Sequence, residues 1–266
     1  MSKLDNPLSI YKVLPKSNCK LCGAPTCLAF AAAIIKGDKR INECPHLDKE
    51  ALEELNGQIV RQMTPEEQLK QILVPLKEEI LNVDFSAAVE RLGAKFSGDK
   101  LTVKCLGKDF TVDSKGNFIS DCHINVWVIV PLLNYIIHSA GKDLSGKWVT
   151  FKELSSDTVW ISFFEKRFEE PLKQLIDSYP DLIEDLILIF NGKHVENSYS
   201  SDISLVLYPL PKVPLLICYK KPVEDLKSQL NIFFDMTADE NLKIDSIYRL
   251  CVGLLVMFQK IASRHT

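Results

Sequence analysis

The sequence lacks an apolar run long enough to cross a bilayer. Its longest apolar stretch, residues 124–137, is interrupted by Asn125, Pro131 and Asn134. It therefore falls short of the ~20 residues that a transmembrane helix needs. The N-terminal residues MSKLDNPLS also lack the apolar segment of a secretory signal peptide. We therefore expect a cytoplasmic protein without a membrane span.

The sequence also has little excess charge and few enzyme signatures. A formal net charge of −3 over 266 residues excludes a globally basic nucleic-acid binder, so no nucleic-acid partner is expected. The chain has no P-loop, no G-x-G-x-x-G and no G-x-S-x-G, so nucleotide-dependent and hydrolase chemistry lack support. An electron-transfer or accessory protein is favoured over a stand-alone enzyme.

The eight cysteines are not spread as a disulfide framework would spread them. Four fall between positions 19 and 44, and the others stand singly in apolar surroundings. Clustering in a chain without a signal peptide indicates a metal site rather than disulfides. The scattered cysteines are expected to be small core residues: Cys105, Cys122, Cys218 and Cys251.

The clustered cysteines form the pattern C-x2-C-x4-C, followed after sixteen residues by C-P. Structural zinc sites usually join two short cysteine pairs, whereas three ligands plus one followed by proline is typical of chains that hold a 4Fe–4S cubane. The spacing favours one 4Fe–4S cluster, with zinc and other iron–sulfur types as the alternatives. Its predicted ligands are Cys19, Cys22, Cys27 and Cys44.

The residues between these cysteines also suit a cluster. Thr26 is expected to cap a helix beginning near Cys27, so that the helix amides face the anionic cluster. Phe30 and the residues that follow it would exclude water, and Gly37 would end the helix. Residues 1–47 carry seven basic and three acidic side chains, a net charge of +4 that leaves −7 for the rest. Three interpretations of this surplus positive charge remain open. It offsets the negative charge of the cluster, it steers an acidic partner towards the module, or it is a solvated lysine face without a further role.

Hydrophobic periodicity predicts an α+β protein in three parts. Residues 1–47 form a small cluster-binding module, residues 48–85 a helical connector, and residues 86–266 a mixed α/β domain with antiparallel strands. In the connector, Thr64 and Glu67 read as a capping box with Pro65 at the first helical position. The apolar face of that helix comprises Leu69, Ile72, Leu73, Leu76 and Ile80.

Within residues 86–266, five strands and several helices are expected. Strands are predicted at 101–106, 110–113, 147–151, 202–208 and 215–220. The last two would be joined through PLPKVP at a sheet edge or over the surface, because proline cannot donate to a ladder. Helices are predicted up to His138 with Asp121 as a cap, along the apolar residues 160–175, up to Asn191, and over 245–261.

The cysteine region closely resembles the Fe–S module of the corrinoid iron–sulfur protein large subunit of acetyl-CoA metabolism. The shared pattern is NC-x-x-CG-x-x-TC-x-x-FA, then G, then CP-x-L. The resemblance implies a 4Fe–4S cluster held by the four cysteines. A related module occurs in electron-transport subunits of anaerobic bacteria. The matching residues are Asn18, Cys19, Cys22, Gly23, Thr26, Cys27, Phe30, Ala31, Gly37, Cys44, Pro45 and Leu47.

The remainder resembles an uncharacterised domain of anaerobic bacteria and archaea that is often fused behind this module. The segments that carry this likeness are GKDLSGKWVTFKEL, FEKRFEEPL, SDISLVLYPLPKVPLLICYKK and FFD. The resemblance implies an anaerobic setting and an architecture, but no catalytic residues. The cobalt-binding barrel of the corrinoid protein is not evident, so cobalamin binding is not carried over.

Weaker signals each have an ordinary explanation. Asp121 and His123 begin a D-x-H-x-x-G corrinoid motif, but Val126 replaces its glycine, and helix capping explains Asp121 better. His46 either tunes the cluster through a hydrogen bond or is exposed. Two interpretations apply to the three tryptophans: they line a pocket for a flat cofactor, or they are core residues. They are Trp127, Trp148 and Trp160. Asp202 and Asp235 stand beside apolar segments as candidates for burial.

Three functions follow from these observations. The first is a one-electron carrier or reductive accessory acting on a redox partner, such as a corrinoid protein or methyltransferase system. The second is a corrinoid- or tetrapyrrole-binding protein that uses the cluster as its reductant. The third is a structural or sensing module that metal binding stabilises.

Overall fold

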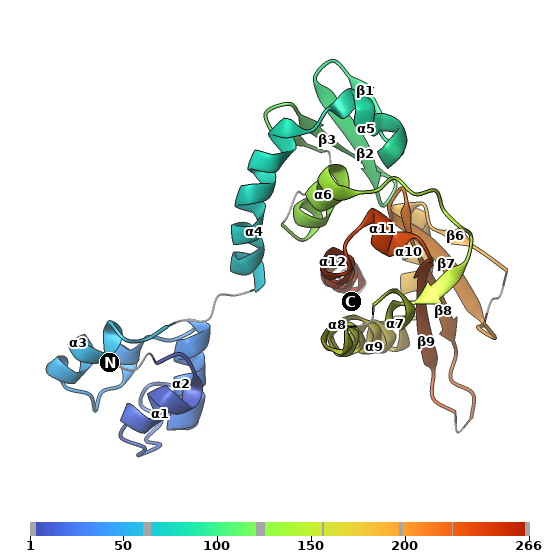
Figure 1. The fold of residues 1–266 in the computed structure, drawn as a ribbon. Helices are drawn as coiled ribbons and strands as arrows, with labels where there is room; N and C mark the ends of the chain where they lie inside the picture. Colours follow the sequence, from blue (N-terminus) through green and yellow to red (C-terminus); the bar gives the residue numbers. More distant parts are fainter. Residues whose placement is uncertain are drawn as a thin grey trace. The chain divides into compact units, whose positions relative to one another are not determined.

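The computed structural model describes residues 4–60, 65–120, 126–155, 157–196, 199–224 and 226–263. The chain divides into two compact units (Figure 1): a first unit, Met1–Gln68, and a second unit, Leu69–Thr266. The first unit is helical, and the second combines helices with two antiparallel sheets, which confirms the predicted α+β class. None of the helices in these ranges is long and apolar enough to span a membrane.

Over the described residues 4–60, the first unit contains three short α-helices and a 3-10 turn. These are α1 (Pro7–Val13), α2 (Cys27–Lys36), η1 (Ile41–Glu43) and α3 (Lys49–Asn56). Asn6 and Ser9 form a capping box that starts α1, which packs against α2. Leu4 bridges to Ile59, and the side chains of α3 pack on the same core. That core comprises Ile10, Leu14, Phe30, Ala31, Ile34, Ile35 and Ile41.

Most of α4 (Pro65–Glu79) belongs to the second unit, which continues with η2 (Ile80–Asn82), α5 (Phe85–Leu92) and a four-stranded meander. Its strands are β1 (Lys95–Ser97), β2 (Lys100–Cys105), β3 (Lys108–Asp113) and β4 (Phe118–Ile119), all paired antiparallel in chain order. The predicted strands at 101–106 and 110–113 are therefore confirmed. Leu76 and Ile80 are buried, while Ile72 and Leu73 pack beside them. Thr64, the predicted cap, and the Leu69 side chain lie outside the described residues.

The larger sheet has the strand order β5-β9-β8-β7-β6 and is antiparallel throughout. Its strands are β5 (Trp148–Thr150), β6 (Lys193–His194), β7 (Ile203–Leu210), β8 (Val213–Lys220) and β9 (Gln229–Asp235). Because side chains alternate along a strand, one face joins the main core and the other forms a small separate cluster. The main-core face includes Leu205, Leu207, Leu215, Ile217, Ile232 and Phe234.

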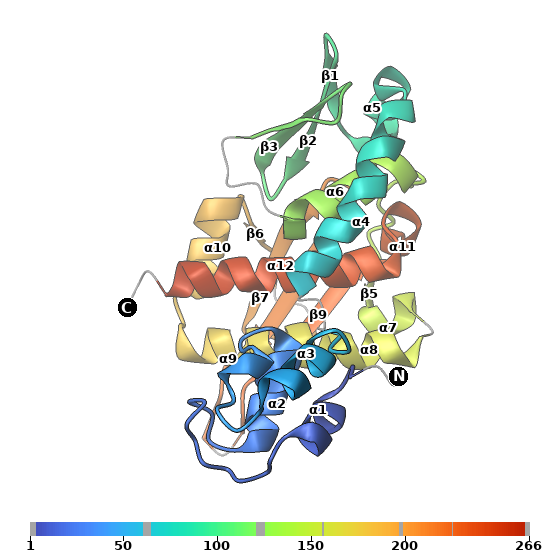
Figure 2. The same ribbon diagram turned by 90° about the vertical axis from the view of Figure 1, so that its left-hand side faces the viewer.

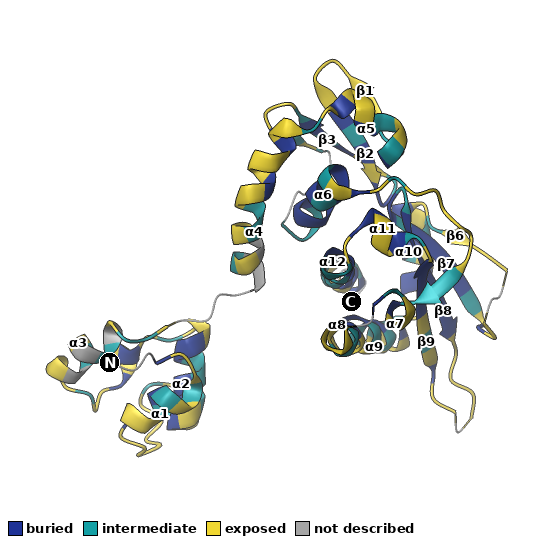
Figure 3. Ribbon diagram, in the orientation of Figure 1, coloured by how far each residue is buried: buried dark blue, intermediate teal, exposed yellow. Residues whose placement is uncertain are grey.

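Helices cover that main-core face of the larger sheet (Figures 1 and 2). They are α8 (Thr158–Phe164), α9 (Glu170–Ser178), α10 (Leu182–Phe190) and α12 (Ile244–Ala262), while α6 (Val126–His138) packs against α12 and α5. Figure 3 shows α12 and α6 largely buried, with exposed positions concentrated on the outward sides of α8 and α9. Three predictions are confirmed: α6 ends at His138, Asn191 is the left-handed C-cap of α10, and α12 spans the predicted final helix. Asp121 lies outside the described residues.

The prediction for the PLPKVP segment is wrong. Instead of lying in a connection at a sheet edge, Pro209 and Pro214 are buried within β7 and β8, two inner strands of the sheet. The register between these strands shifts between Leu207 and Leu210. Such an irregularity accommodates residues that cannot donate to the ladder, so the connection shortens to residues 211–212.

The segment 147–178 also differs in detail from its prediction. The expected strand stops at Thr150, because Thr150 and Glu153 form a capping box that starts α7 (Phe151–Leu154). The apolar helical spacing of residues 160–175 is confirmed, but the helix is interrupted. A π-turn, η3 (Glu165–Glu169), lies between α8 and α9. A short helix α11 (Ala238–Asn241) precedes α12.

Candidate metal centre

The predicted cluster-binding loop folds against the first turn of α2. Thr26 caps the helix, its Oγ1 accepting the Ala29 amide at 3.0 Å, as predicted. Asn18 reaches back over the loop, where its Oδ1 accepts the Cys27 amide at 2.8 Å. The Asn18 amide in turn lies 3.4 Å from Cys27 Sγ, to which it donates. Asn18 thus ties the region around Cys19 to the start of the helix.

The four predicted ligands share the first unit but differ in burial. Cys27 and Cys44 are 8% and 6% exposed and belong to its core, while Cys22 packs beside them half-buried. Cys19 is exposed. Among the described residues, no group of three or more histidine, cysteine or acidic side chains stands close enough to hold a metal ion. The structure therefore brings three of the cysteines to one core and leaves the fourth outside it.

The backbone of the loop has an unusual conformation that suits an anion. Lys16, Asn18 and Lys20 have positive φ values of 59°, 50° and 64°, whereas the residues between them do not. Positive φ is uncommon for non-glycine residues. Alternating left-handed positions turn successive amides to one side, the arrangement that forms concave anion sites around phosphates and iron–sulfur clusters. Gly23 continues the loop with a φ of 74°.

The charges around this loop favour the same type of group. Between Asn6 and Gly37 the chain has four lysines and no aspartate or glutamate. Lys39 also lies near the loop, because a Cβ added at Gly23 would be 3.5 Å from its Nζ. Hydrogen bonds from the Leu21 amide and the Ser17 side chain lower the pKa of the Cys19 thiol. Three of the four proposed ligands fall in this carboxylate-free stretch beside a capped helix N-terminus, while Glu43 precedes Cys44 and pairs with Lys39 at 2.8 Å. The surplus of basic side chains fits an anionic thiolate-ligated cluster.

The other predicted residues take structural or exposed positions. Cys105, Cys218 and Cys251 are buried as expected, whereas Cys122 and His123 lie outside the described residues. His46 is exposed, in agreement with the second of its two interpretations. Burial raises the pKa of the Cys218 thiol, which lies 3.6 Å from the Ser204 hydroxyl.

The three tryptophans do not line a common pocket. Trp148 packs on the outer face of the larger sheet, and Trp160 packs against Phe163 and Tyr248. Trp127 borders an apolar cavity of about 70 Å³ near Gly253. Their role as packing residues is therefore confirmed.

The two aspartates proposed for burial behave differently. Asp235 is 1% exposed, as expected, and is surrounded by hydrogen-bond donors. Asp202 is exposed, so the expectation that it is buried is wrong. Its carboxylate accepts the Lys221 amide at 2.7 Å at the end of β8, where water remains accessible.

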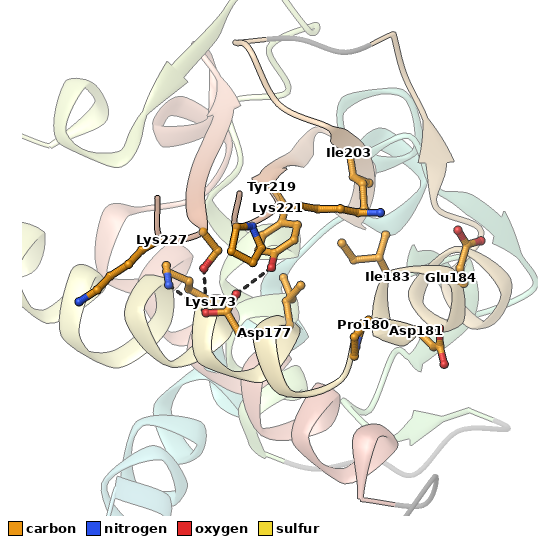
Figure 4. A pocket seen from close by; sticks show the side chains of 13 residues that line it. Lys173, Asp177, Pro180, Asp181, Ile183, Glu184, Ile203, Tyr219, Lys221 and Lys227 are labelled. Atoms are coloured by element: carbon orange, nitrogen blue, oxygen red, sulfur yellow. Dashed lines mark hydrogen bonds and ion pairs between the residues drawn. The ribbon is translucent and has the colours of Figure 1, made fainter. Parts of the chain in front are cut away.

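The second unit contains a groove of about 790 Å³ that sequence reasoning missed (Figure 4). At one end, Asp177 of α9 accepts hydrogen bonds from Tyr219 Oη at 2.7 Å, Ser228 Oγ at 2.8 Å and Lys173 Nζ at 2.9 Å. Burial and the Asp177 carboxylate raise the pKa of Tyr219 to about 12. Tyr219 and Ser228 are far from Asp177 in the chain, so no local sequence motif predicts these hydrogen bonds.

The fold and the cysteine region together define a class of protein: a small cysteine-bearing helical unit joined to an α+β domain. Residues 14–46 match the family described as "Putative Fe-S cluster". Residues 84–257 match the family described as "Domain of unknown function (DUF3786)". Since this second match covers well over half of the chain, the protein belongs to the DUF3786 family.

Curated relatives match stretches of very different length. The gamma subunit of the acetyl-CoA decarbonylase/synthase complex of Methanocaldococcus jannaschii is 24% identical over 239 residues, 86% of this chain and 46% of the relative. The gamma 1 subunit from Methanosarcina thermophila is 35% identical over 82 residues, 30% of this chain and 17% of the relative. The corrinoid/iron-sulfur protein large subunit of Moorella thermoacetica is 49% identical over 50 residues, 19% of this chain and 11% of the relative.

The chain spans at most about half the length of these relatives. No solved structure matches it. The family match over residues 14–46 supports an iron–sulfur cofactor in the first unit.

Proposed function

We propose that the protein binds one 4Fe–4S cluster through Cys19, Cys22, Cys27 and Cys44. In this proposal residues 1–47 are the cluster-binding module, residues 48–85 a connector and residues 86–266 the accessory domain. The observation that carries it is the loop before α2, which combines Cys19, Cys22 and Cys27 with alternating left-handed residues and has no carboxylate from Asn6 to Gly37, while Cys44 is buried in the core that includes Cys27. When bound, the cluster would supply a centre that gains and loses single electrons.

The residues of the first unit have distinct roles in this proposal. Phe30, Ile34 and Ile35 keep water from one side of the site, because all three are buried in the core behind α2. Asn18 Oδ1 accepts the Cys27 amide, and the Thr26 hydroxyl accepts the Ala29 amide. Together these bonds fix the first turn of α2 beside the loop. Cys19, on the exposed side, provides the route for electrons to and from a docked protein.

We infer a one-electron transfer or reductive accessory role in the cytoplasm of an anaerobe. The redox partner is a protein. A corrinoid protein or a methyltransferase system is the partner that the names of the relatives favour. That inference draws on the printed names of the relatives, which are subunits of a decarbonylase/synthase complex and of a corrinoid/iron-sulfur protein.

A panel of cysteine variants tests the ligand assignment. Each of the four proposed ligands is changed to alanine, and iron and sulfide are measured after anaerobic reconstitution. Each change is expected to lower iron to half or less of the wild-type content. Cys218→Ala and Cys251→Ala serve as matched controls, because both thiols are buried away from the loop, in the second unit. Full iron content in all four ligand variants would contradict the assignment.

A second candidate function is corrinoid or tetrapyrrole binding with the cluster as reductant. It is favoured by the Moorella thermoacetica relative, whose name includes a corrinoid. The corrinoid protein that the cysteine region resembles has a cobalt-binding barrel, and a (β/α)8 barrel is built from parallel strands. Both sheets within the described residues are antiparallel, so neither is a barrel of that kind. Titration of the reduced protein with cobalamin, followed by its visible spectrum, separates the two candidates. A stoichiometric spectral change would favour this second function.

A further inference from the structure

The loop that carries the cysteines exposes two large apolar side chains. Leu21, between Cys19 and Cys22, is 70% exposed, and Leu28, directly after Cys27, is 43% exposed. Both are adjacent in the chain to a proposed ligand. The hydrophobic effect disfavours leaving such surface in water, and apolar surface rimmed by polar residues marks interaction sites.

Exposed basic side chains share the loop with Leu21. Lys16 and Lys20 are exposed on the same loop, and the Lys16 ammonium lies 5.6 Å from the centre of the Tyr11 ring, which holds it in place. No carboxylate occurs between Asn6 and Gly37 to neutralise them. The segment therefore exposes both apolar and basic side chains and has no acidic residue of its own.

We propose that this loop surface, comprising Lys16, Lys20, Leu21 and Leu28, is the docking site for an acidic electron-transfer protein. The proposal rests on the proposed function and names the partner's chemistry: a small redox protein with carboxylates around an apolar patch. Leu21 and Leu28 would be desolvated against that patch, while the lysines face the carboxylates.

The composition of the surface fits a transient redox complex. Such interfaces are small, and their partners must separate after each transfer. Complementary charge mainly raises the association rate, and this gain falls as salt screens it. A few apolar residues at the centre then supply most of the short-lived affinity. Because Leu21 lies between Cys19 and Cys22 in the chain, directly before Cys22, docking there would bring the partner close to the proposed cluster.

The test measures electron transfer from a chemically reduced, acidic bacterial-type ferredoxin to the oxidised full-length protein by stopped flow. Lys16→Glu combined with Lys20→Glu is expected to lower the second-order rate about 10- to 100-fold at low ionic strength and to remove most of its salt dependence. Leu21→Ser is expected to lower the rate about tenfold at every ionic strength. Rates are compared per loaded cluster after the iron content of each variant is measured, and reduction by dithionite, a small donor that needs no docking, serves as the reference reaction.

Matched controls come from the second unit. Lys152→Glu and Leu188→Ser alter an exposed lysine and a leucine that is 78% exposed, and both should leave the rate unchanged. Wild-type rates in the loop variants with full iron content would overturn the docking site while leaving the proposed function intact. A wild-type protein that holds the cluster but takes no electrons from the ferredoxin would also overturn it. A wild-type protein without iron would overturn both proposals.

Discussion

Glu169 lies in the π-turn between α8 and α9, where the chain packs against α12. Burial raises the pKa of this carboxyl group to about 7, and the charges of Glu165 and Glu170 act in the same direction. Its charge also contributes to the raised pKa of the buried Cys251 thiol, after burial itself. The π-turn thus holds a partly buried acidic side chain near two other carboxylates, which is unfavourable when Glu169 is ionised.

A pH-dependent stability follows from Glu169. Its folded pKa lies above the unfolded value of about 4.3, so the folded state holds the proton more tightly and stability falls as pH rises from about 4.3 to about 7. Glu169→Gln should remove this loss and raise the free energy of unfolding by on the order of 2 kcal/mol at pH 8. At pH 4 the two proteins should be nearly equal.

Urea unfolding at several pH values checks this expectation, with Glu78→Gln on the exposed side of α4 as the control. An equal pH dependence in wild type and Glu169→Gln would contradict the account of this residue.

At the scale of elements, Asp235 anchors the loop that precedes β5 to the end of β9. Its Oδ1 accepts from the Ser145 amide and hydroxyl and from the Thr237 amide and hydroxyl, while Oδ2 accepts the Gly146 amide at 2.8 Å. Burial raises the pKa of Asp235, but the bonds from Thr237, Ser145 and Gly146 together outweigh it and hold the pKa below its ordinary value. One carboxylate thus fixes the GKDLSGKW segment.

Asp235→Asn should lower the free energy of unfolding by about 2–3 kcal/mol at pH 7, because it removes the charge and one acceptor from a set of charge-assisted hydrogen bonds. A group with a lowered folded pKa stabilises above its unfolded pKa, so the difference should shrink as pH falls below about 4. Chemical unfolding at pH 7 and pH 3 measures it. Asp99→Asn, at an exposed turn, is the control, and an equal effect of both changes would rule out the anchoring role.

Elements defined by short-range signals were predictable from the sequence. Thr26, Gly37 and Asn191 mark helix ends through local geometry, and the structure has them there. The four cysteines were recognised by spacing alone, although their use as ligands stays a prediction.

Features that depend on distant residues were not predictable. The groove end at Asp177 requires residues 42 and 51 positions away. Pro209 and Pro214 fit inside β7 and β8 only because the register shifts there. Neither feature leaves a pattern within a few neighbouring positions, which is all that helix and strand signals contain.

On the scale of the whole molecule, the two units have separate hydrophobic cores. All three tryptophans belong to the second unit, so their fluorescence reports on that unit alone. Loss of the metal site should therefore change iron content without changing the unfolding seen by fluorescence.

Cys22→Ala should lose most of its iron while its fluorescence-monitored unfolding midpoint stays at the wild-type value. Cys105→Ala, in buried β2 of the second unit, should show the reverse: full iron and a free energy of unfolding lower by about 1 kcal/mol. Anaerobic purification followed by iron assay and urea titration measures both. A lowered midpoint in Cys22→Ala would contradict the independence of the two cores.

The central claim is that the first unit binds a 4Fe–4S cluster, and anaerobic purification with metal analysis tests it most directly. Iron, zinc and cobalt are measured per chain, and low-temperature EPR spectra are recorded after dithionite reduction. The account predicts about four iron atoms per chain and a fast-relaxing signal from the reduced cluster. Stoichiometric zinc without an EPR signal would contradict it and leave a metal-stabilised structural module.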